Sequence, residues 1–144
     1  METIFYKQRN RATLVIFGIA FLWIIVNANN HTNIQNYNVP EVNIEQARNL
    51  IKSGAVVIDV RGQQQFDHRH IPGAILLAIS VLRMGIPASF VLDKNIPIII
   101  YCNKGLRHGP EATYILQKAG YKNAVNLHAG IEGWTEAGMP IVRG

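Results

Sequence analysis

The sequence predicts a single α/β domain that is built on a mainly parallel β-sheet. Short apolar runs, each of the length of a buried strand, alternate with segments of helical spacing in the second and third quarters of the chain and beyond. Such alternation indicates parallel strands, because parallel neighbours must be joined by a crossover, which is usually a helix. We predict strands at residues 55–60, 74–79, 96–101 and 124–127.

The first helix of this domain is predicted from its cap. Asn43 is a typical N-cap residue, and Gln46 stands three residues later, at the spacing of a capping box. Apolar residues then recur at helical spacing as far as Ile51, and Gly54 is placed to end the helix. We therefore expect a helix between Asn43 and Gly54.

The remaining elements follow from the same signals. The run at 55–60 places apolar residues on both faces of a strand, as expected in a parallel sheet that is covered on both sides. Helices are expected at 63–68, 111–119 and 131–137, a turn at Ile71-Pro72-Gly73, and one or two short helices within 80–92, interrupted around Pro87.

The N-terminal part of the chain has a different pattern. Residues 12–26 contain no charge, cations at Lys7, Arg9 and Arg11 precede them, and an asparagine-rich stretch at 27–38 follows. Fifteen helical residues span about 22 Å, against about 30 Å of hydrocarbon in a bilayer. The segment therefore fits either a short apolar anchor helix or the apolar region of a secretory signal.

We favour the anchor, because Trp23 stands where an interfacial residue is expected, although Ala28 offers a signal-peptidase site. In both cases the preceding cations favour an orientation that leaves them in the cytoplasm and the rest of the chain outside it, on the periplasmic side. The predicted organisation is a basic segment at 1–11, a transmembrane anchor or uncleaved signal at 12–26, a linker at 27–38 and a globular domain at 39–144.

Composition excludes several other classes of protein. The formal net charge is +5, but no basic run longer than two residues follows Arg11, which gives little support for nucleic-acid binding. A single cysteine excludes an intramolecular disulfide. No metal site is predicted, because the four histidines after the linker have no recognisable ligand spacing: His68, His70, His108 and His128. No cofactor is predicted either.

Cys102 is the candidate nucleophile. It follows an apolar run and opens the segment Cys-Asn-Lys-Gly-Leu-Arg, directly before a helical pattern. A strand that ends in a cysteine, a loop that bends at Gly105 and a helix start place the thiol among backbone N–H groups, which attract negative charge. Lys104 and Arg107 add two cations, so the setting favours the thiolate. A cysteine that serves only as a small buried hydrophobe is the alternative.

Five motifs occur in one order along the chain. They are Ile-Asp-Val-Arg at 58–61, His-Ile-Pro-Gly-Ala at 70–74, Tyr-Cys-Asn-Lys-Gly-Leu-Arg at 101–107, Ala-Gly-Tyr-Lys-Asn at 119–123 and Leu-His-Ala-Gly-Ile-Glu-Gly-Trp at 127–134. Over roughly residues 40–142 the chain resembles the single-domain rhodaneses, a family of thiosulfate sulfurtransferases. The resemblance implies a rhodanese-like domain with a five-stranded parallel sheet flanked by helices. It also implies the transfer of a sulfane sulfur through a cysteine persulfide.

The resemblance assigns roles to the residues around the cysteine. Cys102 would form the persulfide, and the N–H groups of the following loop would surround the bound anion or the outer sulfur. Arg107 either contacts the ligand or stabilises the loop, and Lys104 adds a mobile positive charge at the entrance of the anion-binding site. The expected partners are a small sulfur donor such as thiosulfate, a thiol or cyanide acceptor and, through the N-terminal segment, a membrane; a protein acceptor is also compatible. The predicted substrate-binding residues are Asn103, Lys104, Gly105, Leu106 and Arg107.

The chain departs from the family pattern at a few positions. Gly62 and Gln65 stand where carboxylates are frequent in the family, so we do not expect the ion pair that is usual there near Arg61. His108 stands where a small hydroxyl residue is common, and it either tunes the thiolate or begins the next helix. Ala129 replaces the first of two glycines.

Several nearby polar or aromatic residues are expected to have structural roles. We expect Asp59 and Arg61 to form a turn or an ion pair at the end of the sheet. His70 is expected to be satisfied within a turn, and Trp134 to pack on the core.

Two other functions compete with sulfur transfer. Cysteine phosphatases and arsenate reductases use five residues between cysteine and arginine, whereas this chain has four, at 103–106. A non-catalytic rhodanese-like interaction or sulfur-carrier module at the membrane is the other alternative. Such modules commonly lose the cysteine, which this chain retains together with Arg107.

Overall fold

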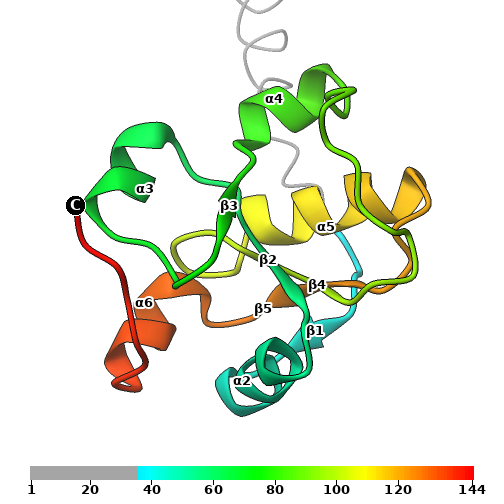
Figure 1. Ribbon diagram of the computed structural model, residues 1–144. Coiled ribbons are helices and arrows are strands. Elements are labelled where there is room, and N and C mark those ends of the chain that lie inside the picture. The colour runs from blue at the N-terminus through cyan, green and yellow to red at the C-terminus, as the bar shows by residue number, and fades with distance from the viewer. Residues whose placement is uncertain (1–35) are drawn as a thin grey trace, which may run out of the picture. The chain divides into compact units, whose positions relative to one another are not determined.

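Five parallel strands form one sheet in the order β1-β5-β4-β2-β3 (Figure 1). The computed structural model describes residues 36–144; the predicted segments 1–11 and 12–26 and most of the linker at 27–38 lie outside the described residues. The strands are β1 (Glu41–Val42), β2 (Val56–Asp59), β3 (Ile75–Leu76), β4 (Ile98–Tyr101) and β5 (Ala124–Leu127).

Helices cover both faces of this sheet. Side chains alternate along a strand, so neighbouring residues of β4 enter different cores: Ile98 and Ile100 pack towards α4 and α5, and Ile99 and Tyr101 pack towards α2 and α6. This two-sided burial explains why the run before Cys102 is apolar throughout. The helices are α2 (Ile44–Lys52), α3 (Gln63–His68), α4 (Ile79–Met84), α5 (His108–Lys118) and α6 (Gly130–Glu136).

Elements with strong local signals form where the sequence predicts them. The capping box of α2 is present, because Asn43 Oδ1 accepts from the N–H of Gln46 at 2.9 Å and Gln46 Oε1 accepts from the N–H of Asn43 at 2.9 Å. The predicted bounds of α3 and β5 are also those of the structure.

The predicted strand at 74–79 is wrong in length. Only Ile75 and Leu76 form β3, and Ile79 already begins α4. β3 is an edge strand that pairs with β2 alone. The chain leaves the sheet there because the N–H of Leu77 bonds to Asp59 O at 2.9 Å and that of Ile79 to Val60 O at 2.9 Å.

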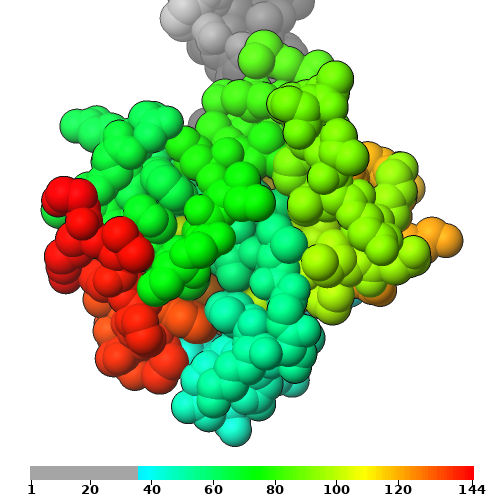
Figure 2. All heavy atoms as spheres, viewed as in Figure 1, coloured from blue at the N-terminus to red at the C-terminus, as the bar shows by residue number. Residues whose placement is uncertain are grey.

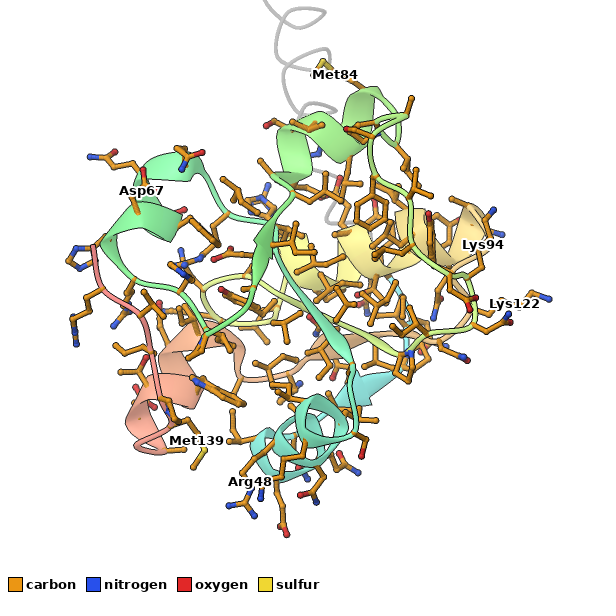
Figure 3. All side chains as sticks on the ribbon, in the orientation of Figure 1. Arg48, Asp67, Met84, Lys94, Lys122 and Met139 are labelled. Atoms are coloured by element: carbon orange, nitrogen blue, oxygen red, sulfur yellow. The ribbon has the colours of Figure 1, made fainter. Side chains whose placement is uncertain are left out.

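Between α4 and β4 the chain contains no second helix. Gly85 ends α4 with a φ of +130°, and residues 85–97 cross the surface without helical structure. Figure 2 shows the first part of this segment as a yellow-green group of atoms beside α4. Met84, at the end of α4, is 83% exposed and points away from the domain (Figure 3).

The helix that follows the cysteine begins at His108, earlier than the predicted residue 111. Pro110 therefore lies in its first turn. A proline is tolerated there because the first N–H groups of a helix have no intrahelical partner. This early start brings the amino end of α5 close to Cys102.

Candidate active site

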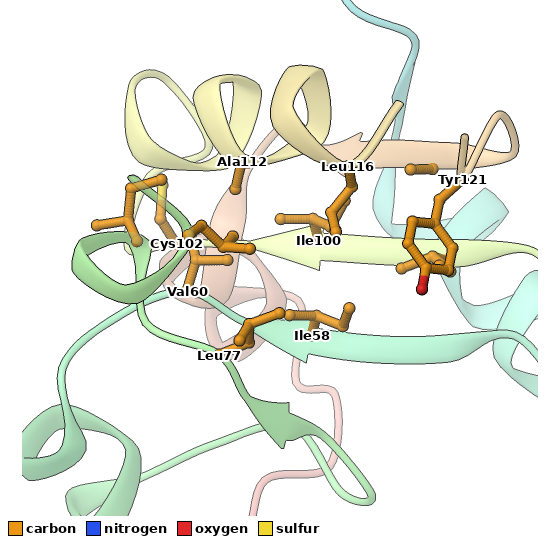
Figure 4. Packing of buried hydrophobic residues seen from close by; sticks show 12 residues of the cluster. Ile58, Val60, Leu77, Ile100, Cys102, Ala112, Leu116 and Tyr121 are labelled. Carbon is orange, nitrogen blue, oxygen red and sulfur yellow. The ribbon is translucent and has the colours of Figure 1, made fainter. Parts of the chain in front are cut away.

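Cys102 is the first residue after β4, at the carboxyl end of the sheet. Its side chain is 6% exposed and packs in the core cluster with Val60 and Ala112, near the amino end of α5 (Figure 4). The thiol is not in a disulfide. The sulfur is therefore surrounded by apolar side chains, and a ligand can reach it only from the cleft that Cys102 lines.

The carbonyl groups around the cysteine are bonded to the scaffold. The N–H of Ile131 donates to Cys102 O at 3.0 Å, and the N–H of Glu132 donates to Asn103 O at 3.0 Å. These donors belong to the first turn of α6, which begins at Gly130 with a φ of +58°. A β-carbon at Gly130 would overlap with Asn103 O, so this close approach requires glycine.

A second anchor holds the middle of the cysteine loop, which we define as residues 103–107. Asn126 is fully buried in β5, and its Nδ2 donates to Gly105 O at 2.8 Å and to Glu41 Oε1 at 2.8 Å. Gly105 has a φ of +70°, and a β-carbon there would overlap with the carbonyl oxygens of Leu127 and His128. Asn126 is not among the residues predicted from the sequence, although a lone amide within a buried apolar strand is a signal that indicates such a role.

The N–H groups of the cysteine loop are in the opposite situation. Within residues 36–144, none of the five backbone N–H groups at 103–107 donates a hydrogen bond. The carbonyl groups of Cys102, Asn103 and Gly105 are therefore hydrogen-bonded to the rest of the domain, whereas the backbone N–H groups of the cysteine loop remain available. Available donors next to a helix N-terminus suit an anionic ligand.

The predicted ion pair at the end of β2 is confirmed. Arg61 Nε donates to Asp59 Oδ1 at 2.9 Å, and Arg61 Nη2 lies 2.6 Å from Asp59 Oδ2. Burial opposes the charge of Arg61, but hydrogen bonding and the charge of Asp59 outweigh it, so the pKa of Arg61 is raised. Asp59 thus supplies a carboxylate for Arg61 in a chain that has Gly62 and Gln65 at the family's usual carboxylate positions.

Arg61 also joins two loops. Its Nη2 donates to Arg69 O at 2.6 Å, and its Nη1 donates to Asn103 Oδ1 at 3.4 Å. Because Asp59 neutralises the guanidinium of Arg61, the main contribution of Arg61 is to position Asn103, the residue that follows Cys102.

A cleft of about 510 Å³ opens above Cys102. Lys104 and Arg107 are exposed on its rim, and their side chains form no hydrogen bond or ion pair with the described part of the chain. Of the predicted substrate-binding residues, Asn103, Lys104, Leu106 and Arg107 line the cleft, whereas the buried Gly105 shapes the loop. The lining residues are Val60, Arg61, Gly62, Gln65, Ala78, Ile79, Ser80, Cys102, Asn103, Lys104, Leu106, Arg107, His108 and Glu132.

One ion pair links the two helices that form a wall of this cleft. Arg83 of α4 donates through Nε and Nη2 to both carboxylate oxygens of Glu111 in α5, each at 2.7 Å. The hydrogen bond from Arg83 is the main reason why the pKa of Glu111 is lowered. The pair fixes α4 against the first turn of α5.

His70 and Trp134, which were also predicted from the sequence to be structural, have partners within the domain. His70 Nδ1 lies 2.9 Å from Phe66 O, and its ring stacks on Phe66 at 3.9 Å between centroids. Trp134 is 4% exposed and donates from Nε1 to Pro140 O at 2.8 Å. Both structural roles predicted for His70 and Trp134 are confirmed.

A parallel five-stranded sheet with a cysteine loop at the carboxyl end of β4 defines an α/β protein with a free thiol at the end of its sheet. Residues 43–137 match the model of the family described as Rhodanese-like domain. The chain belongs to this family, and its relatives include single-domain sulfurtransferases.

Three relatives illustrate the match. The thiosulfate sulfurtransferase GlpE of Haemophilus influenzae is 32% identical over 101 residues, which cover 70% of this chain and 92% of that protein. The uncharacterized protein YibN of Escherichia coli is 32% identical over 100 residues, 69% of each chain. The structure of the human single-domain sulfurtransferase TSTD1 has a TM-score of 0.62 at 27% identity and covers 69% of this chain and 97% of its own.

Proposed function

We propose that the protein is a sulfurtransferase that moves a sulfane sulfur from a donor such as thiosulfate to a thiol or cyanide acceptor through a persulfide on Cys102. The observation that carries the proposal is that one site combines a largely buried thiol, which lines a cleft, with a loop whose backbone N–H donors are available. The names of GlpE and TSTD1 support the same reaction class.

In the first half of the reaction, the Cys102 thiolate attacks the sulfane sulfur of the donor. For thiosulfate, the bond between its two sulfurs breaks, and sulfite leaves with the electron pair. Negative charge then remains on the outer sulfur of the persulfide. The N–H groups of the cysteine loop would stabilise both anions, and each well-aimed donor of this kind is typically worth about 3 kcal/mol.

In the second half, a nucleophilic acceptor attacks the outer sulfur, and Cys102 leaves as a thiolate. Lys104 and Arg107, exposed on the rim, would attract an anionic donor or acceptor to the cleft. This reaction scheme needs no cofactor, because the sulfur of Cys102 itself accepts and releases the transferred atom.

The two competing functions make different predictions at the same site. A loop of four residues between Cys102 and Arg107 is one residue shorter than the loop of a cysteine phosphatase, so a tetrahedral oxyanion would find fewer donors. A binding or carrier module would need neither turnover nor an exposed pair of cations beside the thiol.

Intact-mass spectrometry after thiosulfate treatment tests the proposal. We expect a gain of one sulfur on the wild-type chain and none on Cys102→Ser, which should keep the fold and lose thiosulfate:cyanide sulfur transfer. Substantial transfer by Cys102→Ser would sink the persulfide mechanism. Hydrolysis of aryl phosphates faster than sulfur transfer would favour the phosphatase alternative.

We also propose that residues 12–26 anchor the catalytic domain on the outer face of the cytoplasmic membrane. The uncharged segment, the cations before it and Trp23 near its end support this location. Within residues 36–144, no helix has the length and apolar character needed to cross a membrane. Fractionation with intact-mass analysis tests the proposal: full-length chain in the membrane fraction supports the anchor, and a soluble chain that begins at Asn29 would indicate a cleaved signal instead.

A further inference from the structure

We infer that His108 is the general base that removes the proton of an acceptor thiol in the second half of the reaction. The inference rests on the proposed sulfurtransferase function. His108 is the first residue of α5, is partly buried and lines the same cleft as Cys102. The amino end of α5 reaches the sulfur, because a β-carbon at the adjacent Gly109 would lie 3.6 Å from Cys102 Sγ.

The imidazole of His108 is available for this task. Its ring forms no hydrogen bond and no ion pair with any residue of the described range 36–144. Two other histidines of the domain are held by partners: His70 Nδ1 by Phe66 O at 2.9 Å and His128 Nδ1 by Glu41 Oε2 at 2.7 Å. An imidazole that lines a cleft and forms no described hydrogen bond through either nitrogen can accept a proton from a ligand.

The charged groups around His108 leave its ring accessible from the cleft. The nearest carboxylate on its own helix, Glu111, is engaged by Arg83 through both oxygens, and the charge of His108 adds to the lowering of the pKa of Glu111. Glu132 also lines the cleft. The other charged groups that line the cleft are Arg61, which is paired with Asp59, and Lys104 and Arg107.

A protonated acceptor needs this base, whereas thiosulfate and sulfite do not. Persulfide formation from thiosulfate involves no proton transfer from the donor, and its reverse, the attack of the sulfite dianion on the persulfide, requires none either. A neutral thiol must lose its proton before its sulfur becomes a strong nucleophile. The imidazole takes that proton, the acceptor sulfur bonds to the outer sulfur, and the persulfide bond breaks with its electron pair returning to Cys102. The proton on the imidazole then passes to solvent, and charge and atoms balance.

The test compares acceptors and half-reactions in the full chain and its His108→Gln variant. We expect transfer to 2-mercaptoethanol to fall about 100-fold. Persulfide formation from thiosulfate, followed by intact mass, and transfer of the sulfur back to sulfite should remain within about twofold of wild type. His68→Ala is the matched control, because His68 is exposed and outside this cleft, and it should leave every rate unchanged.

Two further readouts separate a base from a merely structural histidine. The defect of His108→Gln should shrink for an acidic aromatic thiol, which is already ionised at neutral pH. Added imidazole should restore thiol transfer in His108→Ala. Equal losses with sulfite and thiols, or a defect independent of thiol acidity, would overturn the inference. A wild-type chain that forms no persulfide would instead defeat the proposed function itself.

Discussion

The side-chain amide of Asn126 holds Gly105, at the centre of the cysteine loop, by a 2.8 Å hydrogen bond from Nδ2 to the Gly105 carbonyl. The same Nδ2 donates to Glu41 on β1. One buried amide thus connects β5, the outer strand β1 and the loop around the candidate nucleophile. The orientation of the loop donors therefore depends on the interior of the sheet as well as on the loop sequence.

Asn126→Ala should weaken both the fold and the reaction. The Gly105 carbonyl and the Glu41 carboxylate would lose their hydrogen bond to this amide, and a buried acceptor without a partner costs about 1–3 kcal/mol. We expect a loss of that size in the free energy of unfolding, measured by urea denaturation, and a lower kcat/KM for sulfur transfer. Asn123→Ala is the control, because that amide is exposed and bonds only to Asn95 O. Equal effects of the two variants would contradict the special role of Asn126.

Gly105→Ala should be more damaging than an alanine at another left-handed glycine. Both Gly105 and Gly54 have positive φ, at +70° and +92°, so an alanine at either site costs about 1 kcal/mol in backbone strain. At Gly54 nothing lies within 4 Å of the new β-carbon, whereas at Gly105 it would overlap with backbone oxygens. We expect Gly54→Ala to keep full activity and Gly105→Ala to lose most of it, in thiosulfate:cyanide assays beside thermal unfolding. An active, stable Gly105→Ala would show that the loop tolerates a shift.

The elements that the sequence predicts well are those with signals inside the element. The cap of α2 and the polar ends of α3 are local features, and both helices lie where predicted. β1 has only two residues and no pattern of its own, so its pairing with β5 cannot be read locally. The length of β3 was overestimated because apolar residues continue into α4, where they remain buried in a different element.

The candidate site divides in the same way. The cysteine loop is one continuous segment, so its donors and cations are visible in the sequence. The residues that orient it come from other strands: Asn126 and Glu41 are joined by a hydrogen bond across 85 positions, which no local pattern predicts. The Asp59–Arg61 pair is an intermediate case, because its two residues are close in sequence and their pairing was expected.

The ion pair between Arg83 and Glu111 should make stability depend on acidity. The pKa of Glu111 is lowered from its ordinary value of 4.5, chiefly by the hydrogen bond from Arg83. The folded protein therefore gains stability from this carboxylate above pH 4.5, and the gain disappears as the pH falls through the lowered folded value. At pH 7, Glu111→Gln should be less stable than wild type by about 0.5 kcal/mol, as is typical of partly exposed pairs.

Urea denaturation of wild type and Glu111→Gln at pH 7 and at pH 2 would measure this dependence. We expect the difference in unfolding free energy to vanish at pH 2. Glu136→Gln is the control, because Glu136 is exposed and has no ion pair within the described domain. A difference that persists undiminished at pH 2 would mean that the glutamine acts through packing and that the charge of Glu111 is unimportant.

Arg107 and Lys104 should contribute unequally to sulfur transfer, although both are exposed on the rim of the cleft. Arg107 is the N-cap residue of α5, so its backbone is fixed by the helix, and its planar guanidinium can bind two oxygens of a sulfonate at once. Lys104 is a point charge on a flexible stem in the middle of the loop. A charge-assisted hydrogen bond is worth about 1.5–3 kcal/mol, so Arg107→Ala should lower kcat/KM for thiosulfate at least about tenfold. Lys104→Ala should lower it only about twofold, by weakening the attraction of the anion.

Salt separates these two roles. Raising the ionic strength to about 1 M shortens the screening length to about 3 Å, which should reproduce the loss of Lys104→Ala in the wild-type protein and leave most of the Arg107 effect in place. Arg107→Lys, which keeps the charge and removes the planar fork, should behave more like Arg107→Ala than like wild type. Equal losses from the two alanine variants, both matched by salt, would mean that the rim acts only through its net charge.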